Sequence, residues 1–345
     1  MRIAITGATG NVGTSVLAAL AQEPAIDEIV AIARRPAQQL DPRVRFHVAD
    51  VSRDDLTPVL RGVDAVIHLA WQIQPGRDED VTRATNVDGT RRLLEAIAAA
   101  GVDTLVYASS VGAYSPGPKD RRVSESWPTD GIQSSFYSRH KAAVERLLDR
   151  FEQEQPQVRV VRLRPGLIFK RAAATGIRRL FIGPLLPPQL IRRELIPVVP
   201  DVARLRFQAV HSRDVGDAYR LALLDDDARG AFNIAAEPAI DPPLLAELLG
   251  ARLVPLRGGV LRALADVSWR LRLQPSSPGW IDLALGVPLL DTTRAREQLG
   301  WTPRHTATEA LMELLDGLRT RADAQTPPLA HSGSALGATA TGAAA

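Results

Sequence analysis

The chain has 345 residues, 45% of them hydrophobic and 23% charged, so it can bury a large α/β core. It contains no cysteine, which excludes disulfides, thiolate metal ligands and a cysteine nucleophile. The formal net charge of +3 is too small to indicate a polyanion-binding protein, and no stacking or helix-turn-helix motif points to nucleic acid. We find neither an export signal nor the run of about 18 apolar residues that a membrane helix needs. We therefore expect a cytoplasmic protein that does not bind membranes.

Short apolar runs alternate with stretches of helical spacing up to Phe169, and this alternation is typical of βαβ units in a parallel sheet. The apolar runs contain few polar positions, as expected where helices cover both faces of a sheet. The pattern predicts an α/β fold of the Rossmann type, with a doubly wound parallel sheet. The predicted strands are Arg2–Ile5, Glu28–Ala33, Val44–Val48, Ala65–Leu69, Thr104–Ala108 and Val158–Leu163, and the predicted helices are Thr14–Gln22, Asp80–Ala100 and Tyr137–Gln153.

The alternation weakens after residue 169, and prolines gather there. We assign 1–169 to a dinucleotide-binding domain and 170–320 mainly to a smaller C-terminal substrate-binding part, with 207–235 returning to the Rossmann core. Residues 321–345 are mostly small residues and prolines without periodicity, so we expect a disordered tail. Between Arg159 and Arg213 there are twelve Lys or Arg residues and only two acidic residues. This region is either a solvated basic face or a patch that steers an anionic ligand.

A glycine loop lies between the first predicted strand and an apolar helix, in the pattern G-x-x-G-x-x-G. Gly7 permits the turn, Gly10 lets the backbone approach a pyrophosphate, and Gly13 allows close packing of helix on strand. The N-terminus of the helix then points free N–H groups at the anion. A flexible turn can contain the same glycines, but strand, loop and helix together predict a dinucleotide site.

The end of the second strand bears on the choice between NAD and NADP. A carboxylate there would bind the ribose of NAD, but this chain has Arg34 and Arg35, which can pair with a 2′-phosphate. The alternative is a solvated arginine pair. We expect NADP, with NAD as the alternative. After the third strand, Asp50 and Val51 are placed to recognise adenine, unless Asp50 only caps the next turn.

Three residues suit acid–base chemistry on a carbonyl or an alcohol. Tyr137 and Lys141 are four residues apart and share a helix face. The ammonium of Lys141 would favour the phenolate of a tyrosine whose pKa is otherwise about 10. Ser110 follows a strand, where ligands bind open α/β sheets, and would hold the substrate oxygen against Tyr137. Tyr137 would take a proton in oxidation and donate it in reduction. An ordinary amphipathic helix often carries such a Tyr–Lys pair, so the prediction depends on Ser110 and the glycine loop.

These motifs resemble the extended short-chain dehydrogenase/reductase superfamily, also called the NAD-dependent epimerase/dehydratase family, over about residues 1–320. Besides the glycine loop, the resemblance rests on His68–Trp71, Asn86–Thr90, Ser109–Ser110, Tyr137–Lys141, Arg164–Gly166, Val210–Val215 and Leu299–Pro303. It implies that Ser110, Tyr137 and Lys141 are catalytic, that Lys141 also binds the nicotinamide ribose, and that a homodimer forms through the two long helices. The cofactor-binding residues that we expect are Gly7, Thr9, Gly10, Asn11, Val12, Gly13, Arg34, Arg35, Asp50, Val51, Leu69, Ala70, Ser109, Tyr137, Lys141, Pro165, Gly166 and Ile168.

Two departures from the family pattern bear on the substrate. Sugar-nucleotide epimerases and dehydratases usually carry an asparagine where this chain has Leu167, and often an arginine where it has Phe207; Arg206 is one residue off. The Arg-Pro-Gly form at Arg164–Gly166 resembles reductase branches that act on ketones. By contrast, the Gly300–Pro303 motif and the basic region favour an anionic, sugar-nucleotide-like substrate.

We therefore consider three functions. The leading hypothesis is an NAD(P)-dependent oxidoreductase that transfers a hydride between the cofactor and a small carbonyl or alcohol substrate. The second is a sugar-nucleotide epimerase or dehydratase with a tightly held, recycled NAD. The third is a non-catalytic regulator that senses NADP(H), although such regulators often lose the catalytic set. No residue spacing indicates a metal site. We expect His140 to be a helix surface residue and His211 a structural hydrogen-bonding residue.

Overall fold

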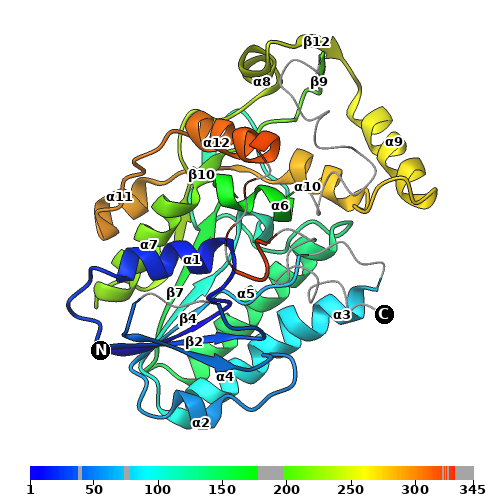
Figure 1. The fold of residues 1–345 in the computed structure, drawn as a ribbon. Coiled ribbons are helices and arrows are strands. Elements are labelled where there is room, and N and C mark those ends of the chain that lie inside the picture. Colours follow the sequence, from blue (N-terminus) through cyan, green and yellow to red (C-terminus); the bar gives the residue numbers. More distant parts are fainter. Residues whose placement is uncertain are drawn as a thin grey trace.

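The computed structural model describes residues 1–37, 41–73, 78–177, 197–320, 322, 324 and 326–330. A seven-stranded parallel sheet with the strand order β11-β7-β5-β4-β1-β2-β3 forms its centre, and helices cover both faces (Figure 1). This confirms the predicted doubly wound α/β fold. The strands are β1 (Arg2–Thr6), β2 (Glu28–Ala33), β3 (Val44–Val48), β4 (Ala65–His68), β5 (Thr104–Ala108), β7 (Arg159–Pro165) and β11 (Gly230–Ile234).

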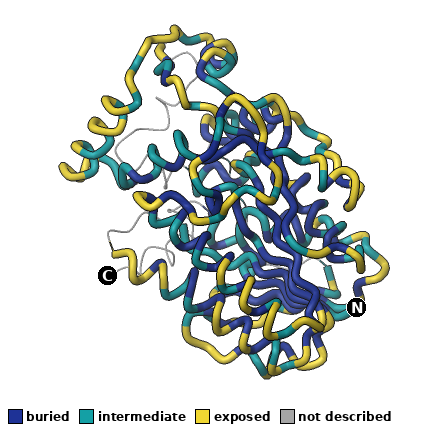
Figure 2. Tube along the Cα trace, turned by 180° about the vertical axis from the view of Figure 1, so that it is seen from behind, coloured by how far each residue is buried: buried dark blue, intermediate teal, exposed yellow. Residues whose placement is uncertain are grey.

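The sheet separates two apolar cores, seen as the dark blue centre of Figure 2. Ile3 and Ile5 of β1 belong to one core and Ala4 to the other, because successive side chains of a strand point to opposite faces. Both faces are buried, which explains the continuous apolar runs in the sequence. The first core is covered by α1 (Asn11–Leu20), α7 (Ser212–Leu224) and α11 (Thr293–Leu299), and the second by α2 (Thr57–Leu60), α4 (Gly89–Ala100) and α5 (Phe136–Glu154).

The predicted helix Asp80–Ala100 is interrupted. It consists of α3 (Glu79–Arg83), a π-helical turn η1 (Ala84–Asp88) and α4. Within the turn, Asn86 bonds the backbone of Gln72 in both directions, since its Oδ1 accepts from the Gln72 N–H at 2.7 Å and its Nδ2 donates to the Gln72 carbonyl at 2.8 Å. Such π-turns are frequent at functional sites. This one fixes the loop that leaves the carboxyl end of β4.

The remaining elements gather beyond the carboxyl ends of the sheet strands, in the upper part of Figure 1. Most of them belong to 170–320, and the division of the chain at residue 169 stays a prediction. Within the predicted disordered tail, 321–345, most residues lie outside the described ones, but Leu329 and Ala330 are buried. The pairs are β8 (Leu167–Phe169) with β10 (Ala209–His211), β9 (Val198–Asp201) with β12 (Arg252–Pro255), and β6 (Arg122–Val123) with β13 (Leu289–Leu290); the helices are α6 (Ala174–Ile177), α8 (Pro242–Leu249), α9 (Gly258–Arg270), α10 (Gly279–Gly286) and α12 (Ala307–Thr320).

No helix among the described residues is both long enough and apolar enough to cross a lipid bilayer.

Candidate functional site

The glycine loop joins β1 to α1 at the carboxyl edge of the sheet. Gly7 has a φ of +71°, a left-handed conformation that strains other residues, and a Cβ on it would lie 2.8 Å from the backbone N of Ala70. A Cβ on Gly13 would lie 2.4 Å from the carbonyl oxygen of Gly7. Both contacts are with backbone, which cannot give way as a side chain can. The two glycines therefore hold the loop tightly against Leu69 and Ala70 at the end of β4.

Gly10 has a different environment. A Cβ on it would lie 3.3 Å from the Gly7 carbonyl oxygen, a slightly tight contact, and would meet no other atom of the described residues within 4 Å, so this side of Gly10 is far less crowded than that of Gly7 or Gly13. Within the described chain, no side chain caps the start of α1, so the first N–H groups of the helix, at Asn11 and Val12, are available to a ligand. An open backbone and free helix N–H groups fit the diphosphate of a dinucleotide. Thr9 is buried beside the loop.

The segment after β7 lies next to this loop. The Asn11 side chain donates to the carbonyl oxygen of Ile168 at 3.4 Å. Pro165 ends β7, and a Cβ on Gly166 would lie 2.6 Å from the carbonyl oxygen of Gln208. The structure therefore brings Ile168 to the glycine loop, whereas Gly166 packs on Gln208, and a cofactor-binding role for Pro165, Gly166 and Ile168 stays a prediction.

Ser110, Tyr137 and Lys141 meet at the carboxyl end of β5. The Oγ of Ser110 accepts a hydrogen bond from the Gly112 N–H at 3.0 Å and lies close enough to the Tyr137 hydroxyl to lower the pKa of that phenol. The Tyr137 ring packs on Gly112, where a Cβ would lie 2.7 Å from its Cε1. The Nζ of Lys141 donates to the carbonyl oxygen of Ala108 at 2.6 Å. The three predicted catalytic residues thus surround one strand end.

Burial controls the ionisation of this group. It raises the pKa of Tyr137 to about 12, against a lowering by the hydrogen bond with Ser110. It also lowers the pKa of Lys141 well below its usual value, and the charge of Glu145 opposes that shift. Lys141 Nζ lies 5.9 Å from the centroid of the Tyr137 ring. In this arrangement burial outweighs the predicted effect of Lys141, so Tyr137 keeps its proton at neutral pH.

Apolar side chains surround Tyr137. Its ring centroid lies 6.0 Å from that of Trp71, edge to face, and 5.3 Å from that of Trp280 in α10. Ile132, Leu283 and Val287 form the buried cluster against which Tyr137 and Trp280 pack. The space next to the Tyr137 ring is therefore aromatic and aliphatic.

The predicted adenosine end lies at β2 and β3. Burial of Asp50 opposes its ionisation, but the side chain and backbone of Ser52 and the charge of Arg34 together lower the pKa of Asp50. One carboxylate oxygen of Asp50 accepts from the Ser52 N–H and hydroxyl, at 2.9 and 2.7 Å, so Asp50 does cap the turn. Arg34 is exposed, Arg35 is partly buried, and Val51 packs against Gly89.

Residues 3–235 match the model of the NAD dependent epimerase/dehydratase family. The chain belongs to this family. An uncharacterised protein of Mycobacterium tuberculosis is 29% identical over 325 residues, which are 93% of this chain but only 30% of that protein. The chain thus spans less than a third of the length of this relative.

Two further proteins are similar to the chain. An L-arabinose 1-dehydrogenase (NAD(P)(+)) of Haloferax volcanii is 39% identical over 109 residues, 32% of this chain and 41% of that protein. The crystal structure of a UDP-glucuronic acid 4-epimerase of Bacillus cereus, in complex with UDP-glucuronic acid and NAD, is 20% identical with a TM-score of 0.67. That match covers 93% of this chain and 100% of the epimerase, and at this identity it shows a common fold.

The site residues predicted from the sequence do not include Glu145, which lies one helical turn after Lys141 and is 1% exposed. Its carboxylate accepts two hydrogen bonds from Arg164, both at 2.9 Å, one from Arg162 at 2.9 Å and one from the Ser109 hydroxyl at 2.5 Å. The hydroxyl of Ser109 is therefore directed at Glu145. The spacing from Lys141 indicated only a shared helix face, and the partners come from β5 and β7.

These contacts also correct the interpretation of the basic region. Arg159, Arg162 and Arg164 are buried, and Arg159 donates to the carbonyl oxygens of Ala222 and Leu223 at 2.9 and 2.7 Å. These three arginines form neither a solvated face nor a steering patch, because they bind acceptors within the core. Arg178, Arg179, Arg192 and Arg193 lie outside the described residues.

The sequence predictions for His140 and His211 had different outcomes. The prediction for His140 is wrong, since it is 2% exposed and its Nε2 lies 3.3 Å from the carboxylate of Glu79. The prediction for His211 is confirmed, because its Nδ1 accepts from the Arg213 N–H at 3.2 Å, and its ring stacks on His305. Among the described residues, no group of three or more His, Asp or Glu side chains could hold a metal ion.

Proposed function

We propose that the chain is an NAD(P)-dependent oxidoreductase acting on a carbonyl/alcohol pair whose reacting end is apolar. The observation that carries this proposal is the environment of Tyr137, whose hydroxyl lies near Ser110 and whose ring contacts those of Trp71 and Trp280. A flat, apolar ketone would bury its surface well there. A sugar would lose water from several hydroxyls in the same place and would meet few polar partners there.

The residues divide the work as follows. Ser110 and Tyr137 would hold the substrate oxygen, and Tyr137, protonated at neutral pH, would donate the proton that this oxygen needs in reduction. Lys141 would hold the nicotinamide ribose, as the family resemblance implies. The glycine loop would hold the diphosphate. When bound, NAD(P) supplies or accepts the hydride.

We propose NADP as the preferred cofactor. Arg34 is exposed at the end of β2 and close enough to Asp50 to lower its pKa, so this edge is where a guanidinium would meet a 2′-phosphate. In the described chain no carboxylate follows β2 directly, which removes the usual partner of the NAD ribose.

A sugar-nucleotide epimerase or dehydratase is the second candidate, favoured by solved structures of the same fold such as the Bacillus cereus enzyme. Two side chains count against it. Leu167 is 42% exposed where such enzymes carry an asparagine, and Phe207 packs in an apolar cluster where they carry an arginine. The neighbouring Arg206 pairs with Asp241 at 3.2 Å. The intact Ser110, Tyr137 and Lys141 set counts against a non-catalytic NADP(H)-sensing regulator.

Substitution of Tyr137 tests the mechanism. Tyr137→Phe should abolish turnover of cofactor with a ketone substrate and leave dinucleotide binding unchanged. Tyr107→Phe is a matched control, because Tyr107 is also buried near Lys141 and its hydroxyl has no hydrogen-bond partner among the described residues. Turnover retained in Tyr137→Phe would refute the assigned mechanism.

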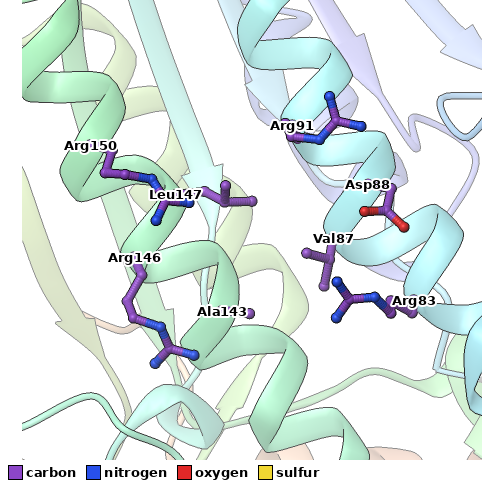
Figure 3. A pocket seen from close by; sticks show the side chains of 8 residues that line it. All are labelled: Arg83, Val87, Asp88, Arg91, Ala143, Arg146, Leu147 and Arg150. Atoms are coloured by element: carbon purple, nitrogen blue, oxygen red, sulfur yellow. The ribbon is translucent and has the colours of Figure 1, made fainter.

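We also propose the homodimer through α4 and α5 that the resemblance implies. A groove of about 300 Å³ between these helices has an apolar floor of Val87, Ala143 and Leu147 (Figure 3). A two-fold contact places the same patch on both copies, so the arginines of the groove, which Asp88 balances only in part, would repel each other unless anions lie between them. Self-association in sedimentation experiments should therefore strengthen with added sulfate, and a monomer at every sulfate concentration would refute the dimer. The arginines are Arg83, Arg91, Arg146 and Arg150.

A further inference from the structure

Lys170 lies directly beside the first turns of α1, although it is 159 residues away from Asn11 in the sequence. It follows β8 and is partly buried. Its Nζ donates to the carbonyl oxygen of Asn11 at 2.7 Å, to Thr14 Oγ1 at 2.6 Å and to Ser15 Oγ at 3.2 Å. All three acceptors are uncharged, so the ammonium has hydrogen bonds here but no carboxylate.

A cation in this position is unfavourable for the protein alone. The N-terminus of a helix carries a partial positive charge, and a second positive charge beside it is repelled. Burial and, to a smaller extent, the charge of Arg213 lower the pKa of Lys170 to about 8, against an opposing effect of Glu313. The carboxylate of Glu313 itself lies 2.9 Å from His211 Nε2. When a residue lowers the stability of the folded protein in this way, a role in binding a ligand is the best explanation for its presence.

We propose that Lys170 is a positioning residue for the diphosphate of the dinucleotide. It binds the carbonyl oxygen of Asn11 and adds a positive charge to the helix turn whose free N–H groups would face that anion. This inference rests on the proposed function and deepens its cofactor site. The glycine motif itself contains no basic residue, so Lys170 supplies a charge that the motif lacks.

The diphosphate is common to NADH and NADPH, so the proposal predicts that a change at Lys170 affects the binding of both dinucleotides equally. Lys170→Met removes the charge and keeps the length of the side chain. It should weaken the binding of both dinucleotides by roughly tenfold and reduce the salt dependence of binding. Lys170→Arg, which keeps the charge, should restore much of the affinity. Thermal stability should change little in Lys170→Met, because the loss of three hydrogen bonds to uncharged acceptors is offset by the removal of a repulsion with the helix.

The experiment is a fluorescence titration of the full chain with NADH and with NADPH at two salt concentrations, beside a thermal unfolding curve. Arg171→Met is the matched control, because Arg171 is adjacent in sequence, 52% exposed in its side chain and paired with Asp316. Equal affinities of the wild type and Lys170→Met would overturn the inference and leave the proposed function standing. A loss confined to NADPH, or one that appears only together with lower thermal stability, would also overturn it. A wild type that binds neither dinucleotide would overturn the proposed function and this inference with it.

Discussion

The ammonium of Lys141 lies 3.4 Å from the centroid of the Trp71 ring. Trp71 follows β4 and Lys141 belongs to α5, so this cation–π contact ties the end of β4 to the helix that carries Tyr137. When desolvated, such a contact is worth about 2 kcal/mol, which offsets part of the cost of burying Lys141. The indole N–H of Trp71 has no hydrogen-bond partner among the described residues. This edge of the sheet therefore retains a buried donor that a ligand can use.

The ionisation of Tyr137 predicts opposite pH profiles for the two reaction directions. Oxidation needs the deprotonated phenol, whose pKa is raised to about 12, so its rate should rise about tenfold for each pH unit through the alkaline range. Reduction needs the protonated phenol and should not depend on Tyr137 below that pKa. Ser110→Ala removes a hydrogen bond that lowers the pKa, so it should displace the oxidative profile to higher pH. Steady-state rates over a pH series measure both effects, and an oxidative rate that peaks near neutrality would contradict the assignment.

Two glycines of one loop should respond differently to the same substitution. In Gly13→Ala the new Cβ would clash with the Gly7 carbonyl, so we expect a loss of about 1 to 3 kcal/mol in the free energy of unfolding. In Gly10→Ala the new Cβ would meet the Gly7 carbonyl oxygen at 3.3 Å, which a small shift of the loop can relieve, so we expect a folded chain with weakened dinucleotide binding. Denaturant unfolding and fluorescence titration of the two variants separate these effects. Unchanged dinucleotide affinity in Gly10→Ala would place the diphosphate elsewhere.

The sequence predicts the parts of this fold that depend on local patterns. The bounds of β2, β3 and β5 agree with the predicted strands, because each is a short segment of mainly β-branched, aromatic or aliphatic residues between turn residues, although β3 also contains Arg45 and His47. The π-turn at Ala84–Asp88 could not be predicted, since it depends on a hydrogen bond between Asn86 and a loop fourteen residues earlier. The apolar residues of 80–100 recur at helical spacing whether or not the π-turn is present, so the sequence pattern does not reveal the turn.

The residues of the candidate site also fall into those that the sequence predicts and those that it does not. Ser110, Tyr137 and Lys141 could be found because their spacing has a physical meaning on a strand end and a helix face. Trp280 and Lys170 could not, because each reaches the site from a segment without regular alternation, and only the folded chain brings them to Tyr137 and Asn11. His140 was mistaken for a surface residue because helical position alone does not reveal what packs against that face.

Glu145 should be essential for stability. Glu145→Ala would leave Arg162 and Arg164 buried without their shared carboxylate, a loss of about 3 to 5 kcal/mol for breaking a buried pair. Asp149→Asn is a suitable control, because Asp149 also pairs with Arg162 but its side chain is 55% exposed. Thermal unfolding of the two variants is the measurement. Equal stability of Glu145→Ala and the wild type would show that the arginines find other partners.

The arginine pair after β2 should decide the cofactor preference. Arg34→Ala combined with Arg35→Ala should weaken NADPH binding by at least about tenfold and leave NADH binding nearly unchanged, because only NADPH carries the 2′-phosphate. Arg45→Ala, which removes an exposed arginine of β3 paired with Glu28, is the control. Fluorescence titrations with both dinucleotides give the comparison. Equal binding of NADH and NADPH by the wild type would contradict the assignment of the arginine pair.

Net turnover of the cofactor is the most direct test of the proposed oxidoreductase activity. The purified chain is mixed with NADPH or NADH and a series of cyclic, apolar ketones, and separately with UDP-glucose, while the nicotinamide absorbance is followed. The proposal predicts that absorbance falls with at least one ketone, that Tyr137→Phe abolishes this fall, and that UDP-glucose has no effect. Constant absorbance with every ketone, together with conversion of the UDP-sugar, would contradict it and establish epimerase or dehydratase chemistry instead.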